Sequence, residues 1–382
     1  MSQSPVAAGL EGVVAAQTRL SLVDGQRGVL VIAGFPVEEI APKASFEEMV
    51  FLLWNDRLPS ASELAAFRAE LAGLRTLPPA TATLLRQAAA QKAPVIDALR
   101  MACATLSLKA AGETESSDPR RDAKALVARF PVIVAAYWRL LQGQEPLPAD
   151  PALGHCANFL FQLTGKKASP ERVRALETYL NTVSDHGFNA STFTARVIIS
   201  TASDMVSAVT GAIGALKGPL HGGAPGPALD MVFEIGSADR AESVLRAKLE
   251  RGERLMGFGH RVYKVRDPRA DVLAGAAKLL YTGDADRKLY ELATSVEHVA
   301  LRLLEEKKPG RNLKTNVEFY TALVLHGVEL PTELFTPCFA MGRVAGWTAH
   351  GFEQQALAKL IRPQSVYVGP TDRMYAPVER RT

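Results

Sequence analysis

A run of basic side chains occupies the stretch Met256–Arg269, whose sequence is MGFGHRVYKVRDPR. Five of them lie within ten residues, namely His260, Arg261, Lys264, Arg266 and Arg269. The pair Asp267-Pro268 predicts an N-cap followed by proline at the first helical position, so Arg269 is expected in the first turn of a helix. The macrodipole disfavours a cation there, whereas the free backbone N–H groups attract an anion. The stretch is therefore either an anion-binding site or a solvated basic turn.

Two histidines lie in glycine-rich turns where they could carry hydrogen-bonding or acid–base chemistry. His221 stands between a proline-leucine pair and a double glycine, just before an expected helix start. A histidine at the positive end of a helix stays neutral and can still donate a hydrogen bond to an oxygen that gains charge, a pattern known from enzymes. His186 precedes a glycine and the polar run 189–191. The alternative at both positions is a structural histidine or a loop histidine bound to water.

One acid and two arginines occupy positions where their charge needs an explanation. Glu318 is expected early in a helix, where an acid ordinarily stabilises the N-terminus, so on its own it predicts little. Arg343 lies within the otherwise apolar run Phe339–Trp347. A buried arginine needs an anionic partner, and we expect either a carboxylate ligand or a protein acid opposite it. Arg362, just before a proline, suits the same task, although a surface role is common for such a residue.

Composition places the chain among ordinary folded proteins. Its 382 residues are 47% apolar and 22% charged, with a net charge of +4, enough for one large domain or two. The small net charge and the lack of a long Lys/Arg run argue against nucleic-acid binding. The N-terminus lacks the basic and apolar regions of a signal peptide. The separated cysteines Cys103, Cys156 and Cys338 form no disulfide framework, so we expect a reducing, cytoplasmic location.

Several other classes of site are not supported. The sequence has no HExxH, HxH or Cys/His spacing typical of a metal site, and no Walker A, dinucleotide or GxSxG motif. The most apolar long run, 191–218, is interrupted by charged residues and predicts one buried helix rather than a membrane span.

Mostly helical elements must position these side chains. Two β-rich runs around Asp24-Gly25 predict one hairpin near the N-terminus. Helical patterns follow, the last two expected helices spanning 333–349 and 353–361, and an extended tail is expected after them. The βαβ alternation of a parallel sheet is missing, so we expect a mainly α fold with one small N-terminal β-hairpin.

Two joints rich in glycine and proline divide the chain, near 218–227 and 326–331. If they act as hinges, residues 222–328 form a small lobe inserted into a large one. The large lobe would then comprise residues 1–221 and 329–382.

Four motifs, taken together and in this order, resemble those of the citrate synthase family. They are GPLHGGA at 218–224, MGFGHRVYKVRDPRA at 256–270, NVEFY at 316–320 and RP at 362–363. The resemblance extends from EGVVAAQTRLSLVDGQ at 11–26 to YVGP at 367–370. It implies a mainly helical, two-domain subunit of a homodimer that condenses acetyl-CoA with oxaloacetate and hydrolyses the thioester to citrate and CoA. It implies neither a metal nor a redox cofactor, because acetyl-CoA enters as a substrate.

The resemblance also implies a role for each matching residue. His221 would hydrogen-bond the thioester oxygen while Glu318 takes a proton from the methyl group, and His260 would polarise the ketone of oxaloacetate. The residues implied to hold the oxaloacetate carboxylates are His186, Arg269 and Arg343, with Arg362 contributed by the neighbouring subunit. The residues implied to line the CoA site are Leu255, Met256, Gly257, Phe258, Gly259 and Lys264.

Glu318 departs from the family pattern, in which aspartate is usual at this position. Its side chain is longer by one C–C bond, about 1.5 Å, and a misplacement of roughly 1 Å costs on the order of 100-fold in rate. We expect an active enzyme with Glu318 as the base. The closest enzymatic alternative is 2-methylcitrate synthase, which uses propionyl-CoA, since one methylene shifts a preference by only about 1–3 kcal/mol. An alternative from another class is a non-catalytic protein that senses CoA or dicarboxylates.

Overall fold

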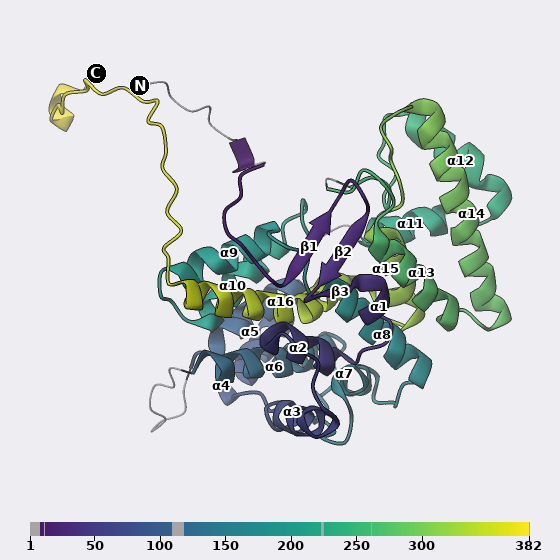
Figure 1. The fold of residues 1–382 in the computed structure, drawn as a ribbon, viewed down its shortest axis with the longest axis horizontal. Coiled ribbons are helices and arrows are strands. Elements are labelled where there is room, and N and C mark those ends of the chain that lie inside the picture. Colours follow the sequence, from purple (N-terminus) through teal and green to yellow (C-terminus); the bar gives the residue numbers. More distant parts are fainter. Residues whose placement is uncertain (1–7, 11, 109–117, 223–224, 261, 382) are drawn as a thin grey trace.

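Helices account for most of the fold, as the sequence predicts. The computed structural model describes residues 8–10, 12–108, 118–222, 225–260 and 262–381. Within these ranges, one sheet of three short strands lies beside sixteen α-helices (Figure 1). Arg261 of the basic stretch lies outside the described residues. The mainly α fold class is therefore confirmed.

The predicted hairpin is present near the N-terminus, after a short 3-10 turn at Ala8–Leu10. Strand β1 (Ser21–Asp24) runs antiparallel to β2 (Val29–Ile32). A third strand, β3 (Phe35–Pro36), pairs with β2. The sequence does not predict β3, because two residues, one of them proline, give no strand pattern.

The hairpin turn, residues 25–28, packs against the basic stretch 256–269. The Gly25 carbonyl accepts a hydrogen bond from the Lys264 N–H at 2.8 Å. A Cβ atom on Gly25 would overlap the carbonyl oxygen of Val262, so only glycine permits this close approach. The N-terminal sheet thus supports one side of the loop that carries His260.

Serine side chains cap the starts of two of the early helices. Ser45 and Ser60 each form a capping box with the glutamate three residues later, which satisfies orphan backbone donors at each helix start. Helices α2 to α7 form the lower part of the molecule in Figure 1. The first seven helices are α1 (Val37–Ile40), α2 (Phe46–Asn55), α3 (Ala61–Gly73), α4 (Pro79–Ala90), α5 (Val95–Thr105), α6 (Pro119–Leu141) and α7 (His155–Thr164).

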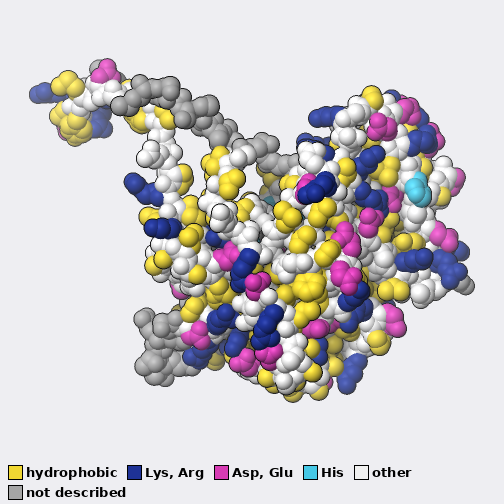
Figure 2. All heavy atoms as spheres, viewed as in Figure 1, with side chains coloured by type: hydrophobic (Ala, Val, Ile, Leu, Met, Phe, Trp, Pro, Cys, Tyr) yellow, Lys and Arg dark blue, Asp and Glu magenta, His cyan; other side chains and the backbone are white. Residues whose placement is uncertain are grey.

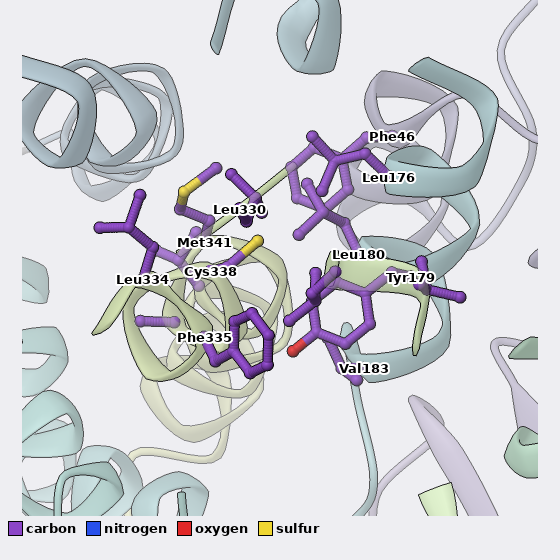
Figure 3. Close-up of a cluster of buried hydrophobic side chains, with 14 of the residues drawn as sticks. Phe46, Leu176, Tyr179, Leu180, Val183, Leu330, Leu334, Phe335, Cys338 and Met341 are labelled. Atoms are coloured by element: carbon purple, nitrogen blue, oxygen red, sulfur yellow. The ribbon is translucent and has the colours of Figure 1, made fainter. Parts of the chain in front are cut away.

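Helix α16 (Phe335–Leu357) crosses the middle of the molecule and packs against α6 and α8 to α10. Its contact with α8 (Pro170–Val183) is apolar, and Figure 3 shows Phe335 of α16 beside Tyr179 and Leu180 of α8. All three side chains are buried. This contact forms part of the core beneath the candidate site.

Two of the predicted helix boundaries are wrong. The apolar run 191–218 forms two helices, α9 (Ala190–Ser200) and α10 (Met205–Leu216), because the Asp204 carboxylate caps the start of α10. Conversely, α16 is one continuous helix where two were expected. It runs through Gly351, whose buried packing offsets the low helix propensity of glycine.

The helices between α10 and α16 gather on the right-hand side of Figure 1. Helix α13 packs against both α15 and α8, so this group is attached to the central helices. Its members are α11 (Pro225–Ile235), α12 (Ala241–Glu250), α13 (Pro268–Leu280), α14 (Asp284–Lys307) and α15 (Val317–Gly327), with 3-10 turns at Ala238–Arg240 and Thr332–Leu334. The division into a small lobe, 222–328, and a large lobe stays a prediction.

The chain after α16 leaves the body of the molecule as an extended tail, yellow in Figure 1, with a 3-10 turn at Val378–Arg380. Apolar side chains on this tail are exposed, and Figure 2 shows some of them at its end. They are Leu360, Val366, Tyr367, Val368, Met374, Tyr375 and Val378. Exposed apolar surface of this kind is typical of an interaction site. In the described part of the chain, no helix combines the length and the apolar character needed to span a membrane.

Candidate active site

Two segments far apart in the sequence pair side by side at the centre of the candidate site. Phe258 and Thr315 form an isolated antiparallel bridge. Gly257, beside the bridge, has φ +87°, and a Cβ atom there would press on a phenylalanine of α15, so glycine is required. The pairing brings His260 close to the N-terminus of α15, where Glu318 lies.

The buried carboxylate of Asp267 joins the starts of α13 and α15. It caps α13 as predicted, accepting from the Arg269 N–H at 3.0 Å. It also accepts from Nε and Nη2 of the Arg269 guanidinium at 3.0 and 2.8 Å. A further hydrogen bond, at 3.2 Å, comes from the Val317 N–H of α15. Arg269 is therefore held in place, and its Nη1 has no hydrogen-bond partner among the described residues.

His260 turns one ring nitrogen to the backbone and the other to Arg269. Nδ1 accepts from the N–H groups of Val262 and Tyr263 at 3.0 and 3.2 Å, so the ring proton lies on Nε2. Burial, together with the Arg269 charge, lowers the pKa of His260 to about 4, and the ring is neutral near pH 7. Its Nε2 lies 3.3 Å from Arg269 Nη2. Two N–H donors this close together suit an acceptor oxygen placed against both.

His186 and Arg343 approach the same group from the central helices. The His186 ring centroid lies 5.9 Å from that of His260. Arg343, on α16, is 1% exposed and donates from Nε to the Val183 carbonyl at 2.6 Å. Its guanidinium forms no ion pair with any residue that the structure describes. Asp185 is the acid that acts on Arg343 electrostatically, but it makes no ion pair with the guanidinium.

Burial and positive charge together set the protonation of these groups. Burial lowers the pKa of Arg343 to about 10, and Arg269 contributes to the fall while Asp185 opposes it. The guanidinium therefore stays charged at neutral pH. Burial and the charges of the same two arginines lower the pKa of His186 well below its usual range, so this ring is neutral. Two buried guanidiniums, of which Arg269 is paired with Asp267, thus lie beside neutral imidazoles.

A buried polar network supports the turn that carries His186. The Asp185 carboxylate accepts from Ser21 Oγ at 2.5 Å and from His350 Nε2 at 3.0 Å. His350 Nδ1 in turn accepts from Arg196 at 3.1 Å, so the histidine proton lies on Nε2. The network ties strand β1, helix α9 and helix α16 to one turn, and it fixes the backbone next to His186.

His221 lies half-buried in the turn between α10 and α11. Its Nε2 is 2.8 Å from Ser191 Oγ, which also accepts from the Trp347 Nε1–H at 3.0 Å. Burial, with the charge of Arg343, lowers the pKa of His221 to about 4. The Phe339 ring lies 6.1 Å from the His221 ring and 4.8 Å from the Arg343 guanidinium. His221 is therefore a neutral hydrogen-bonding group, and Phe339 packs against both His221 and Arg343.

Glu318 lies in the first turn of α15, whose N-cap Asn316 accepts from the Glu318 N–H at 3.0 Å. Burial raises the pKa of the Glu318 carboxyl above its usual value, and the charge of Arg269 opposes that rise. None of the described residues donates a hydrogen bond to this carboxylate. Arg269 acts electrostatically on Glu318, His186 and His260 alike.

The remaining predicted residues lie beside this group or outside it. Residues 255–259 lead directly into His260, and Leu255 is 4% exposed. The Lys264 side chain is exposed on the loop that contacts the hairpin turn. Arg362 is exposed on the C-terminal tail beyond the end of α16. The structure thus groups His186, His260, Glu318 and the two arginines, joins His221 to them through Arg343, and leaves Arg362 on the tail.

Comparison with known proteins assigns the chain to a protein family. The family model “Citrate synthase, C-terminal domain” matches residues 9–364. The chain belongs to the citrate synthase family. Citrate synthase 2 of Bacillus subtilis strain 168 is 40% identical over 376 residues, and a 2-methylcitrate synthase of Shewanella oneidensis is 38% identical over 377 residues. Each comparison covers 98% of both chains.

A solved structure also resembles the citrate synthase fold of this chain. It is the ternary complex of carboxymethyl coenzyme A and oxaloacetate with citrate synthase from Thermoplasma acidophilum. Its TM-score is 0.87 at 33% identity, and the match covers 99% of this chain and 100% of the other. Family membership makes the chain an acyltransferase of the citrate synthase type.

Three side chains of this citrate synthase site are not singled out by the sequence. Ser191 contacts His221, Asp185 supports the His186 turn, and the Tyr263 hydroxyl lies 3.0 Å from His186 Nε2. Each is close in sequence to a predicted residue or lies in a quoted motif. Their partners come from distant parts of the chain, however, so no local pattern reveals the contacts.

Proposed function

We propose that the chain is a citrate synthase that condenses acetyl-CoA with oxaloacetate and then hydrolyses the thioester. The observation that carries this proposal is the pair of buried guanidiniums of Arg269 and Arg343, the second of which has no ion-pair partner among the described residues. A dicarboxylate supplies two negative charges, and planar guanidinium groups match carboxylates in two-point contacts. Neutral His186, which is influenced by both cations, would add a hydrogen bond.

The proposed chemistry assigns one step to each of three side chains. Glu318 removes a proton from the methyl group of acetyl-CoA, while His221 donates a hydrogen bond to the thioester oxygen as charge develops there. The enolate carbon then attacks the ketone carbon of oxaloacetate, and His260 gives its Nε2 proton to the new alkoxide oxygen. Water then attacks the thioester carbon of citryl-CoA and returns a proton to His260, while the C–S bond breaks and the departing thiolate takes the proton held by Glu318, which yields citrate and the CoA thiol. The neutral state of both histidines supports their use as donors.

The proposed role of His221 requires its proton on Nδ1, since Nε2 lies against Ser191. The Ser191 hydroxyl has one hydrogen and two acceptors at 2.8 Å, His221 Nε2 and Asn189 Oδ1. A hydroxyl group can rotate to suit its partners. Turning its hydrogen toward Nε2 leaves the Nδ1–H of His221 for the thioester oxygen.

We further propose that the backbone of 255–259 and Lys264 line the CoA site, with no cofactor beyond the substrate CoA. We propose a homodimer in which Arg362 of the partner subunit completes the oxaloacetate site. The exposed apolar side chains of the tail support this assembly, because such surface is usually covered by another chain. The three cysteines are free and buried, which fits a reducing, cytoplasmic location.

Release of the CoA thiol tests the proposal and separates it from the main alternative. Purified protein is given oxaloacetate with either acetyl-CoA or propionyl-CoA, and kcat/KM is compared with a thiol reagent as the readout. We expect a preference for acetyl-CoA of about 10-fold or more, the scale of one methylene in an apolar pocket. The reverse preference would make the chain a 2-methylcitrate synthase. No thiol release from folded protein with either substrate would favour a binding protein.

A further inference from the structure

Tyr263 contacts three of the residues proposed to bind oxaloacetate, although it carries no charge itself. It is 2% exposed and lies in the loop that carries His260. Its backbone N–H donates to His260 Nδ1 at 3.2 Å, and the two ring centroids lie 4.9 Å apart. The Arg269 guanidinium lies 5.7 Å from the Tyr263 ring centroid, a cation–π distance. One buried ring therefore packs against both His260 and Arg269.

The hydroxyl of Tyr263 reaches across to a different segment of the fold. It lies 3.0 Å from His186 Nε2, and the two ring centroids are 5.6 Å apart. Among the described residues, this hydroxyl has no other hydrogen-bond partner. Residues 186 and 263 are 77 positions apart, so the contact links the turn after α8 with the loop before α13.

An imidazole needs such a partner if its orientation is to be fixed. Rotation about χ2 of histidine is broad, and each orientation presents a different edge to a ligand. Arg269, Arg343 and His260 all disfavour a proton on His186, so none of them can hold the ring through an ion pair. A neutral hydroxyl can donate to or accept from Nε2 whichever tautomer is present. The Tyr263 hydroxyl is thus chemically suited to hold a neutral ring between two cations.

We propose that Tyr263 is a positioning residue for oxaloacetate, whose hydroxyl fixes the His186 imidazole toward the space beside Arg269 and Arg343. The proposal rests on the proposed function, because it assumes that His186 contacts a carboxylate of oxaloacetate. A contact made equally in the bound substrate and in the transition state lowers KM without changing kcat. Loss of the hydroxyl should therefore raise the KM for oxaloacetate and leave kcat nearly unchanged.

The variant Tyr263→Phe removes the hydroxyl and keeps the ring that packs on His260 and Arg269. We expect the KM for oxaloacetate to rise about 10-fold, which corresponds to a loss of about 1.4 kcal/mol, the scale of one hydrogen bond. Tyr137→Phe is the matched control. Tyr137 lies on α6, which contributes no residue to the candidate site, and it is also buried. Its hydroxyl donates to the Ala93 carbonyl, between α4 and α5, at 2.6 Å.

Melting temperatures show whether both variants fold, and both should lose a similar, small amount of stability. Only Tyr263→Phe should alter the KM for oxaloacetate. An unchanged KM in folded Tyr263→Phe, or an equal rise in Tyr137→Phe, would overturn the proposal. The wild-type enzyme is measured first, because wild-type protein without turnover would refute the proposed function instead.

A double-mutant cycle tests whether Tyr263 acts through His186. The affinity for oxaloacetate is measured by calorimetry for Tyr263→Phe, His186→Ala and the double variant. If Tyr263 only positions His186, adding Tyr263→Phe to His186→Ala should change the affinity by less than about 2-fold. Losses that multiply would show that the hydroxyl acts independently of His186 and would reject a positioning role.

Discussion

Replacing Glu318 by glutamine tests the proposed base most directly. The amide keeps the size of the side chain, and the Asn316 cap on the Glu318 N–H is a backbone contact that the change leaves in place. Glutamine cannot take a proton from acetyl-CoA, and general-base catalysis contributes about 10²–10⁴-fold. We therefore expect kcat to fall by that factor. The KM for oxaloacetate should change little, because the Asp267–Arg269 pair does not depend on Glu318.

The variant Glu318→Asp allows a second prediction of the fall in kcat, which follows from the geometry of α15. Glu318→Asp withdraws the carboxylate by about 1.5 Å, one C–C bond. The start of α15 cannot shift freely to compensate, because the Asn316 N–H donates to the Gly257 carbonyl at 2.9 Å and Asn316 Nδ2 donates to the Gly259 carbonyl at 2.8 Å. A base left this far short should lower kcat on the order of 100-fold.

Both variants are assayed by CoA thiol release at saturating oxaloacetate and acetyl-CoA. Glu291→Gln, an exposed acid on α14, is the matched control and should retain wild-type turnover. Turnover of Glu318→Gln near that of wild type would refute the assignment of the base. Turnover of Glu318→Asp equal to wild type would show that the fixed start of α15 does not set the reach of the carboxylate.

Three further variants probe the anion site, the core and the hairpin. Arg343→Lys keeps the positive charge but loses the two-point geometry of the guanidinium. Truncating a buried charge contact costs about 2–5 kcal/mol. Steady-state kinetics should therefore show the KM for oxaloacetate rising on the order of 100-fold. Burial raises the pKa of Glu177 to about 7, although the charge of Arg174 opposes the rise. The folded state therefore binds the proton of the Glu177 carboxyl more tightly than the unfolded state does. As a result, the free energy of unfolding falls by about 3 kcal/mol as pH rises from 4.5 to 7. Glu177→Gln should therefore melt above wild type at pH 8 but not at pH 4, and equal melting at pH 8 would contradict this. Gly25→Ala should lower both the melting temperature and kcat, because the added Cβ displaces the hairpin turn from the loop at Val262. Unchanged CoA thiol release would show that the hairpin turn does not support the loop that carries His260.

Much of the candidate site could be predicted because its residues stand at local irregularities of the chain. Asp267-Pro268 is an N-cap signal, and the structure starts α13 there. Arg343 is conspicuous as a cation inside an apolar helix, and it is indeed buried without a protein acid paired to it in the described residues. The signals of charged and capping residues depend only on neighbours within a few positions, so they can be recognised in a single sequence.

Contacts between distant segments could not be predicted in the same way. His350 pairs with Asp185 across 165 positions, and no periodic pattern connects the two. The break between α9 and α10 shows a related difficulty, because Asp204 resembles an interruption of one apolar helix until its capping bond is seen. Strand β3 depends on pairing with β2 rather than on its own two residues. In each case the deciding interaction lies outside the local pattern or depends on the backbone geometry.

The charge balance of the site explains how Arg343 is kept free of an ion pair. Arg269 is neutralised directly, with Asp267 at 2.8 Å. Asp185 is the acid that most opposes the fall in the Arg343 pKa, yet hydrogen bonds from His350 and from strand β1 hold its carboxylate in place. An unpaired buried cation is destabilising, and a bound dianion removes that cost only in the complex. Under the proposed function, the arrangement that makes Arg343 receptive to a carboxylate therefore also lowers the stability of the free protein, and the Asp185–His350 pair helps to maintain it.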